Sequence, residues 1–343
     1  MMLHYLAVGF ALQIAPLFVA VATANDLSDC AGGDAAKGIP ACTRIIDGAD
    51  QAPGKLAEAY VNRAKLYIVQ SDLDRALADL DEALRRNPGH ANAHHNRGVA
   101  YTLQGRHGEA LGALGEAIRL DPKNAAESYH TRGRVHVDLG QWDAAIAEFD
   151  AALRTDPRHV DALISRGAAH HLQGRFGPAM ADFDQAVRVA PDNGDAYAAR
   201  GALYMMTSRF PQALADLDRA IKLNPEDETA YLNRGLTYLF QRQFDRAIPD
   251  FDQALRVNPH NAHVLVQRAS AYFFKKQPDR ALSDVNEAIR LDAAALQAYK
   301  LRGAILTGMG RRDQAIADFR KALELDPSDA SAKKNLRDLE ARP

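Results

Sequence analysis

Residues 194–227 read GDAYAARGALYMMTSRFPQALADLDRAIKLNPED, and residues 228–261 repeat the pattern as ETAYLNRGLTYLFQRQFDRAIPDFDQALRVNPHN. Both stretches carry Arg-Gly at the seventh and eighth positions and a proline near the end. The same dipeptide, with alanine in place of glycine twice, recurs along the chain at intervals of 34 residues, with one interval of 35. A fixed period of this length indicates a repeat array rather than two ordinary domains.

Aligning the chain on this dipeptide gives eight repeats. Alanine stands twelve residues after the glycine or alanine in all eight, and again seven residues further on. Proline follows five residues later in seven repeats, with Ala293 as the exception. The repeats span residues 57–329, as 57–90, 91–124, 126–159, 160–193, 194–227, 228–261, 262–295 and 296–329.

The spacing within each repeat predicts two helices. Gly98 and Tyr101 lie on one face of a first helix, and Ala110, Leu114 and Ala117 lie on one face of a second. Small residues where the two faces meet allow the backbones to approach closely, and a bulky residue there would overpack the contact. Glycines between the helices and prolines after the second indicate the turns.

Thirty-four residues, a helix-turn-helix pattern and these residue columns resemble the tetratricopeptide repeat family. The resemblance covers residues 57–329 and implies an all-α, right-handed solenoid of eight helix-turn-helix repeats with helical caps. The seventh repeat departs most, at Pro278 and Ala293, and Pro249 is expected to distort the second helix of the sixth.

Segments outside the repeats are expected to cap the array. Residues 330–343 are polar and amphipathic and predict a C-terminal capping helix. Residues 25–56 form an N-terminal cap segment with a predicted helix from Asp34 to Ile46. Cys30 and Cys42, the two cysteines of the chain, lie in this segment and are expected to form one disulfide. A redox or metal pair would need tighter spacing or further ligands.

The first 24 residues predict export. Residues 6–24 carry no charged side chain and end in Ala22-Thr23-Ala24, which is typical of a signal peptide cut after Ala24. The mature protein is then periplasmic or secreted and has no membrane span. The alternative is an uncleaved N-terminal membrane anchor. The formal net charge of −2 gives no reason to expect nucleic acid as a partner.

An arginine occupies the same position in all eight repeats, and seven repeats carry an acid sixteen residues later. That spacing leads from the first helix to the second, so we expect partly buried ion pairs within each repeat. A ladder of exposed arginines that binds an anionic polymer is the alternative, which the matching acids disfavour. Arg97 lacks its acid. The pairs are Arg63 with Asp79, Arg132 with Glu148, Arg166 with Asp182, Arg200 with Asp216, Arg234 with Asp250, Arg268 with Asp284, and Arg302 with Asp318.

The resemblance also implies where a partner would bind, because first helices line the concave side of such arrays. The stripe opposite the buried face is apolar in repeats four to seven and suits an apolar or amphipathic segment of a partner protein. Packing against the neighbouring repeat is the alternative for each of its residues. The candidates are His95, His130, Ile164, Met205, Leu232, Leu236, Leu239, Val266 and Phe273.

No nucleophile, phosphate-binding or zinc-protease motif is present, so we expect a non-enzymatic scaffold in the cell envelope, of an exported bacterial type, with no cofactor or metal. Two alternatives remain. One is a scaffold for polysaccharide export or envelope assembly. The other is a metal-dependent factor that uses the histidine-rich N-terminal repeats, around His90, His94, His95 and His130.

Overall fold

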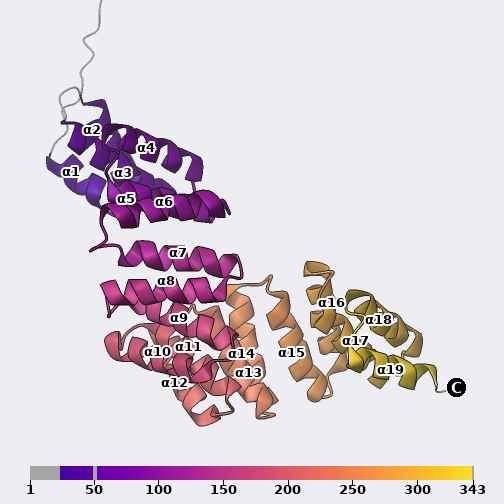
Figure 1. The fold of residues 1–343 in the computed structure, drawn as a ribbon. Coiled ribbons are helices and arrows are strands. Elements are labelled where there is room, and N and C mark those ends of the chain that lie inside the picture. Colours follow the sequence, from indigo (N-terminus) through magenta and orange to yellow (C-terminus); the bar gives the residue numbers. More distant parts are fainter. Residues whose placement is uncertain (1–23, 49–51, 342–343) are drawn as a thin grey trace, which may run out of the picture. The chain divides into compact units, whose positions relative to one another are not determined.

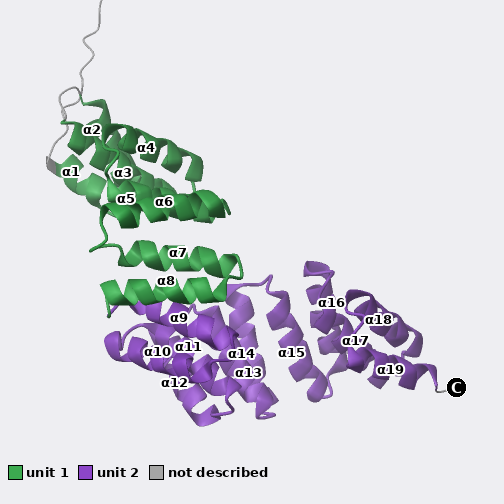
Figure 2. Ribbon diagram, in the orientation of Figure 1, with its two compact units in different colours: residues 1–157 green, residues 158–343 purple. Residues whose placement is uncertain are grey.

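Helices alternate with short turns along the whole computed structural model, which describes residues 24–48 and 52–341 (Figure 1). Within those ranges there are 19 helices and no strand, so the all-α fold of eight helix pairs predicted from the sequence is confirmed. The chain divides into two compact units, residues 1–157 and residues 158–343 (Figure 2). We describe each unit by itself.

The N-terminal unit contains a two-helix cap followed by three helix pairs. In each pair the first helix packs against the second, and within this unit the first helices of successive pairs contact each other. The helices are α1 (Ala24–Ala31), α2 (Ala35–Asp47), α3 (Pro53–Val69), α4 (Leu73–Arg86), α5 (Ala91–Leu103), α6 (His107–Leu120), α7 (Ala126–Asp138) and α8 (Trp142–Thr155).

The C-terminal unit contains five helix pairs and the terminal capping helix. Here the same packing recurs, and α18 packs against α19 at the end of the array. The helices are α9 (Val160–Leu172), α10 (Phe176–Val189), α11 (Gly194–Met206), α12 (Phe210–Leu223), α13 (Glu228–Phe240), α14 (Phe244–Val257), α15 (Ala262–Phe274), α16 (Pro278–Leu291), α17 (Leu296–Gly308), α18 (Arg312–Leu325) and α19 (Ala330–Glu340).

The turn inside each repeat depends on one residue in the left-handed conformation. Four repeats use glycine there, as at Gly105 with φ of 70°, and four use serine, arginine or lysine, as at Arg242 with φ of 58°. The N–H of Gly105 bonds to the carbonyl of Thr102, and the N–H of Arg106 bonds to the carbonyl of Tyr101. These two bonds satisfy carbonyls at the helix end, which stabilises the conformation even where the residue is not glycine.

A glycine on the first helix faces a large apolar side chain on the second. In the sixth repeat, a Cβ atom added at Gly235 would lie 2.7 Å from the Phe251 ring. The Phe251 side chain is fully buried. Five further repeats show the same contact, at Gly98, Gly133, Gly167, Gly201 and Gly303. The Arg-Gly dipeptide therefore marks the closest approach of the two helices.

The N-terminal cap contains one helix more than the sequence predicted. Helix α2 matches the expected helix, with Asp34 as its N-cap, and α1 precedes it. The disulfide between Cys30 and Cys42 joins the two helices, and Cys42 is fully buried. The proposed signal peptide lies outside the described residues except for Ala24. Among the helices described, none is long and apolar enough to cross a bilayer.

Pro249, which was expected to distort its helix, and Pro278 are both accommodated in second helices. Pro249 lies within α14, which runs through it as an α-helix, and its side chain is exposed. On that face water can hydrate the carbonyl that loses its hydrogen bond. Pro278 is the first residue of α16, where the helix has no intrahelical partner for an N–H. The seventh repeat therefore folds like the others.

Candidate functional site

The arginine that recurs in each repeat bridges the two helices of its repeat wherever the matching acid is present. Arg234 on α13 donates from Nε and one terminal nitrogen to the carboxylate of Asp250 on α14, at 2.9 and 2.6 Å. Its other terminal nitrogen donates to Asp218 on α12, in the preceding repeat, at 2.7 Å. Hydrogen bonding to Asp250 raises the pKa of Arg234 above its ordinary value. One side chain thus joins two successive repeats.

Three consecutive repeats share this arrangement. Each arginine pairs with the acid sixteen residues later and with another acid sixteen residues earlier. The first acid is buried and the second is partly exposed. The sets are Arg200 with Asp216 and Asp184, Arg234 with Asp250 and Asp218, and Arg268 with Asp284 and Asp252.

The remaining arginines of the column show the pair within the repeat wherever the acid is present. Arg97, whose repeat has alanine at the acid position, contacts Asp81 of the preceding repeat at 3.4 Å instead. Each arginine of the column is therefore matched by at least one acid. The other pairs are Arg63 with Asp79, Arg132 with Glu148, Arg166 with Asp182, and Arg302 with Asp318.

The stripe predicted to bind a partner is more covered than the sequence suggested. Side chains of neighbouring helices bury three of its nine candidates, which are His130, Met205 and Val266. Val266 also lines a pocket of about 220 Å³ with Leu296. The other six candidates are half-buried: His95, Ile164, Leu232, Leu236, Leu239 and Phe273.

The exposed apolar surface lies one residue further along the chain. In six repeats the last residue of the first helix is a large apolar side chain that is exposed, and we call this set the edge column. In repeats four to seven its members are 54% to 62% exposed. The edge column comprises Val69, Leu103, Leu172, Met206, Phe240 and Phe274.

Aromatic rings gather at the end of the edge column in the C-terminal unit. The rings of Phe244 and Phe274 stack with centroids 5.5 Å apart, and Phe273 of the stripe lies 5.7 Å from Phe274. At the other end of this unit, His171 Nε2 lies 2.9 Å from the sulfur of Met206. Each of repeats four to seven therefore presents apolar side chains of the stripe and, next to them in sequence, one exposed member of the edge column. Large exposed apolar side chains that recur in four consecutive repeats mark a candidate interaction site.

The clustered histidines where the first repeat meets the second each bind a different group. His90 Nε2 lies 3.0 Å from Glu58, His94 Nε2 lies 3.0 Å from the carbonyl of Pro88, and His95 Nδ1 lies 2.9 Å from the hydroxyl of Ser128. These contacts direct the three rings to different partners rather than to one metal ion.

We predict that acid weakens the second repeat through His95. Burial lowers the pKa of this imidazole, and Lys65 lowers it further. The unfolded chain takes up the proton near pH ~6.5 whereas the folded chain resists it, so stability is present above that pH and is lost as pH falls below it. The expected slope is at most about 1.4 kcal/mol per pH unit for this residue.

Urea unfolding of the protein at about pH 7.5 and about pH 5.5 checks this. His95→Gln should lose less stability than the unmodified protein between the two pH values. Equal losses in both proteins would show that His95 does not titrate in the expected sense.

Paired helices, a repeating contact between a glycine and a large apolar side chain, and an arginine column together define a helical repeat protein. Tetratricopeptide repeat models match residues 61–125, 130–196, 201–271, 262–294 and 296–329. These matches cover most of the chain, which therefore belongs to the tetratricopeptide repeat family.

Solved structures share the fold at low sequence identity. The structure of the APC/C hetero-tetramer Cut9–Hcn1 matches with a TM-score of 0.67 and 17% identity over 82% of this chain, which spans 55% of the matched one. A tetratricopeptide repeat protein from Parabacteroides merdae matches with 0.57 and 20% identity, over 73% of this chain and 98% of that one. The type IV pilus biogenesis factor PilW matches with 0.58 and 18% identity, over 62% and 99%. A comparison with curated proteins finds no match.

Proposed function

We propose that this protein is a non-enzymatic scaffold of the cell envelope that binds an apolar or amphipathic segment of a partner protein. The surface formed by the stripe and the edge column in repeats four to seven carries this proposal. Four exposed side chains, one from each repeat, continue a half-buried apolar stripe: Leu172, Met206, Phe240 and Phe274.

The chemistry of this surface favours a protein segment as the ligand. Its methionine and aromatic side chains offer adaptable apolar contacts but few hydrogen-bonding groups, and such surfaces accept apolar faces of amphipathic helices. The arginine column cannot hold an anionic polymer in the same way, because the described arginines already hydrogen-bond to acids of their own or adjacent repeats.

Location in the envelope is supported by two features of the N-terminal region. The uncharged segment that ends in Ala22-Thr23-Ala24 is typical of an export signal. The disulfide between Cys30 and Cys42 suits an oxidising compartment. A reporter that is active only after export, fused behind residue 40, should be active outside the cytoplasm, and activity confined to the cytoplasm would contradict this part of the proposal.

Peptide selection against the immobilised protein, followed by calorimetry, tests the binding surface. We expect selected peptides to carry apolar residues at helical spacing. Phe240→Glu should weaken their binding by about 100-fold, because a carboxylate would replace an apolar contact at the centre of the surface. Phe240 is exposed, so this variant should fold normally.

Leu325→Glu is the matched control, because Leu325 is also exposed but ends the second helix of the eighth repeat. It should bind the peptides like the unmodified protein. If Phe240→Glu and Leu325→Glu both bind normally, the ligand does not occupy the proposed surface.

A further inference from the structure

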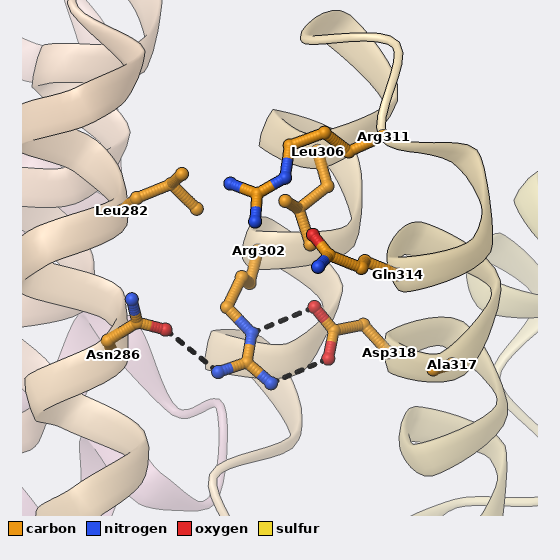
Figure 3. A pocket seen from close by; sticks show the side chains of 8 residues that line it. All are labelled: Leu282, Asn286, Arg302, Leu306, Arg311, Gln314, Ala317 and Asp318. Carbon is orange, nitrogen blue, oxygen red and sulfur yellow. Dashed lines mark hydrogen bonds and ion pairs between the residues drawn. The ribbon is translucent and has the colours of Figure 1, made fainter.

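A pocket of about 330 Å³ lies between the seventh and eighth repeats, among α16, α17 and α18 (Figure 3). Its lining combines two guanidinium groups, two side-chain amides and one carboxylate with a small apolar wall. The lining residues are Leu282, Asn286, Arg302, Leu306, Arg311, Gln314, Ala317 and Asp318.

The arginine of the column contacts one acid fewer in this interface than in the three preceding interfaces. Arg302 donates to both carboxylate oxygens of Asp318 at 2.8 and 2.7 Å, as in the other repeats. Its remaining bond goes to the amide oxygen of Asn286 at 2.8 Å (Figure 3). The three preceding interfaces have a carboxylate in this position, from Asp184, Asp218 and Asp252. Here the second negative charge is missing.

A tyrosine is also missing from this interface. In the fifth repeat Arg209 stacks on the ring of Tyr204, with 4.5 Å between the guanidinium carbon and the ring centroid. In the eighth repeat the corresponding residues are Arg311 and Leu306. Leu306 is smaller than tyrosine and offers no π face, and Arg311 makes no side-chain hydrogen bond or ion pair with any residue that the structure describes. Its guanidinium extends into the pocket (Figure 3).

The replacement of aspartate by Asn286 changes the local charge. In the fifth repeat the matching positions hold two arginines and two aspartates, so their formal charges cancel. In the sixth and seventh repeats glutamine stands at the Arg209 position. The second arginine there, Arg246 or Arg280, comes three residues later in its repeat and stacks on a tyrosine, so the formal charges still cancel. In the eighth, Arg302 and Arg311 face Asp318 alone, which leaves one positive charge uncompensated beside an apolar wall.

We propose that this pocket binds one organic carboxylate with a short apolar body. The carboxylate pairs with the planar guanidinium of Arg311, which matches its two oxygens, and accepts from the Gln314 amide. The apolar body rests on Leu282, Leu306 and Ala317. With the ligand bound, two carboxylates face two guanidinium groups, as in the three preceding interfaces. The carboxylate can belong to a free organic acid or to the C-terminus of a peptide.

Titration of the full-length protein with butyrate tests this, with the Nε–H resonances of labelled arginines as the readout. We expect a saturable shift at one arginine, which Arg311→Gln removes from the spectrum together with most of the affinity. Asn286→Asp supplies the missing carboxylate in place and should weaken butyrate binding about tenfold or more. This variant should fold, because three preceding repeats carry aspartate there.

Arg209→Gln is the control, since Arg209 stacks on tyrosine, and it should bind butyrate normally. Acetyl-leucine and its amide distinguish the sources. Tighter binding of acetyl-leucine than butyrate, with none of the amide, assigns the site to a peptide C-terminus, and the reverse order assigns it to a free acid. Absence of saturation, tighter binding of phosphate than butyrate, or equal affinity in Asn286→Asp overturns the proposal.

Discussion

Replacing Asp250 with alanine is expected to lower the free energy of unfolding by about 3 kcal/mol. The Asp250 side chain is buried and accepts two hydrogen bonds from Arg234. Burial raises the pKa of Asp250 and the hydrogen bonds from Arg234 oppose that shift, so the intact pair contributes little net stability. Removing only the acid is costly because Arg234, itself about one-fifth exposed, keeps its charge and loses its buried partner.

Hydrogen exchange of the amides of α13 and α14 measures this effect in the repeat concerned. Asp218→Ala is the matched control, because it removes the other acid that Arg234 contacts. That side chain is 57% exposed, so we expect a loss below about 1 kcal/mol. Equal losses in the two variants would show that the contact between repeats is as important as the contact within the repeat.

The pair within the repeat was predicted from the sequence, whereas the bond to the preceding repeat was missed. The sixteen residues from Arg234 to Asp250 span the turn of one helix-turn-helix repeat. The two residues therefore lie on the first and second helices of the same repeat, which pack against each other. The bond to Asp218 depends on how one repeat stacks on the next. An acidic column sixteen residues before the arginine, at Asp184, Asp218 and Asp252, was the available signal.

The exposed apolar side chains lie on the same first helices as the predicted stripe, but one residue further along the chain. Helical periodicity predicts which face of a first helix is opposite the core, and Met205 and Val266 satisfy it. It does not predict that the adjoining repeat covers them. Met206 and Phe274 are each the last residue of their helix. The adjoining repeat does not cover them, and they are exposed.

The second prediction concerns the close helix contact in the sixth repeat. Phe251→Ala is expected to lower the free energy of unfolding by about 3–5 kcal/mol, because it removes a fully buried ring and leaves a cavity. Gly235 cannot fill that cavity, since it has no side chain and its helix position is fixed by the neighbouring repeats. Phe251→Leu should cost much less, because the second and fifth repeats place Leu114 and Leu217 against the same glycine column.

Phe274→Ala tests whether an aromatic residue of the edge column contributes to peptide binding rather than to stability. Its ring is 54% exposed at the end of the edge column, so we expect a change in stability of about 0.5 kcal/mol or less. The same variant should weaken binding of the selected peptides, because it removes the ring that stacks on Phe244 at the surface. Urea unfolding measures the stability of this variant, and calorimetry on the same preparation measures its affinity for the peptides. A large loss of stability in Phe274→Ala would mean that the edge column belongs to the core of the array, and its exposure would then no longer support a role in binding.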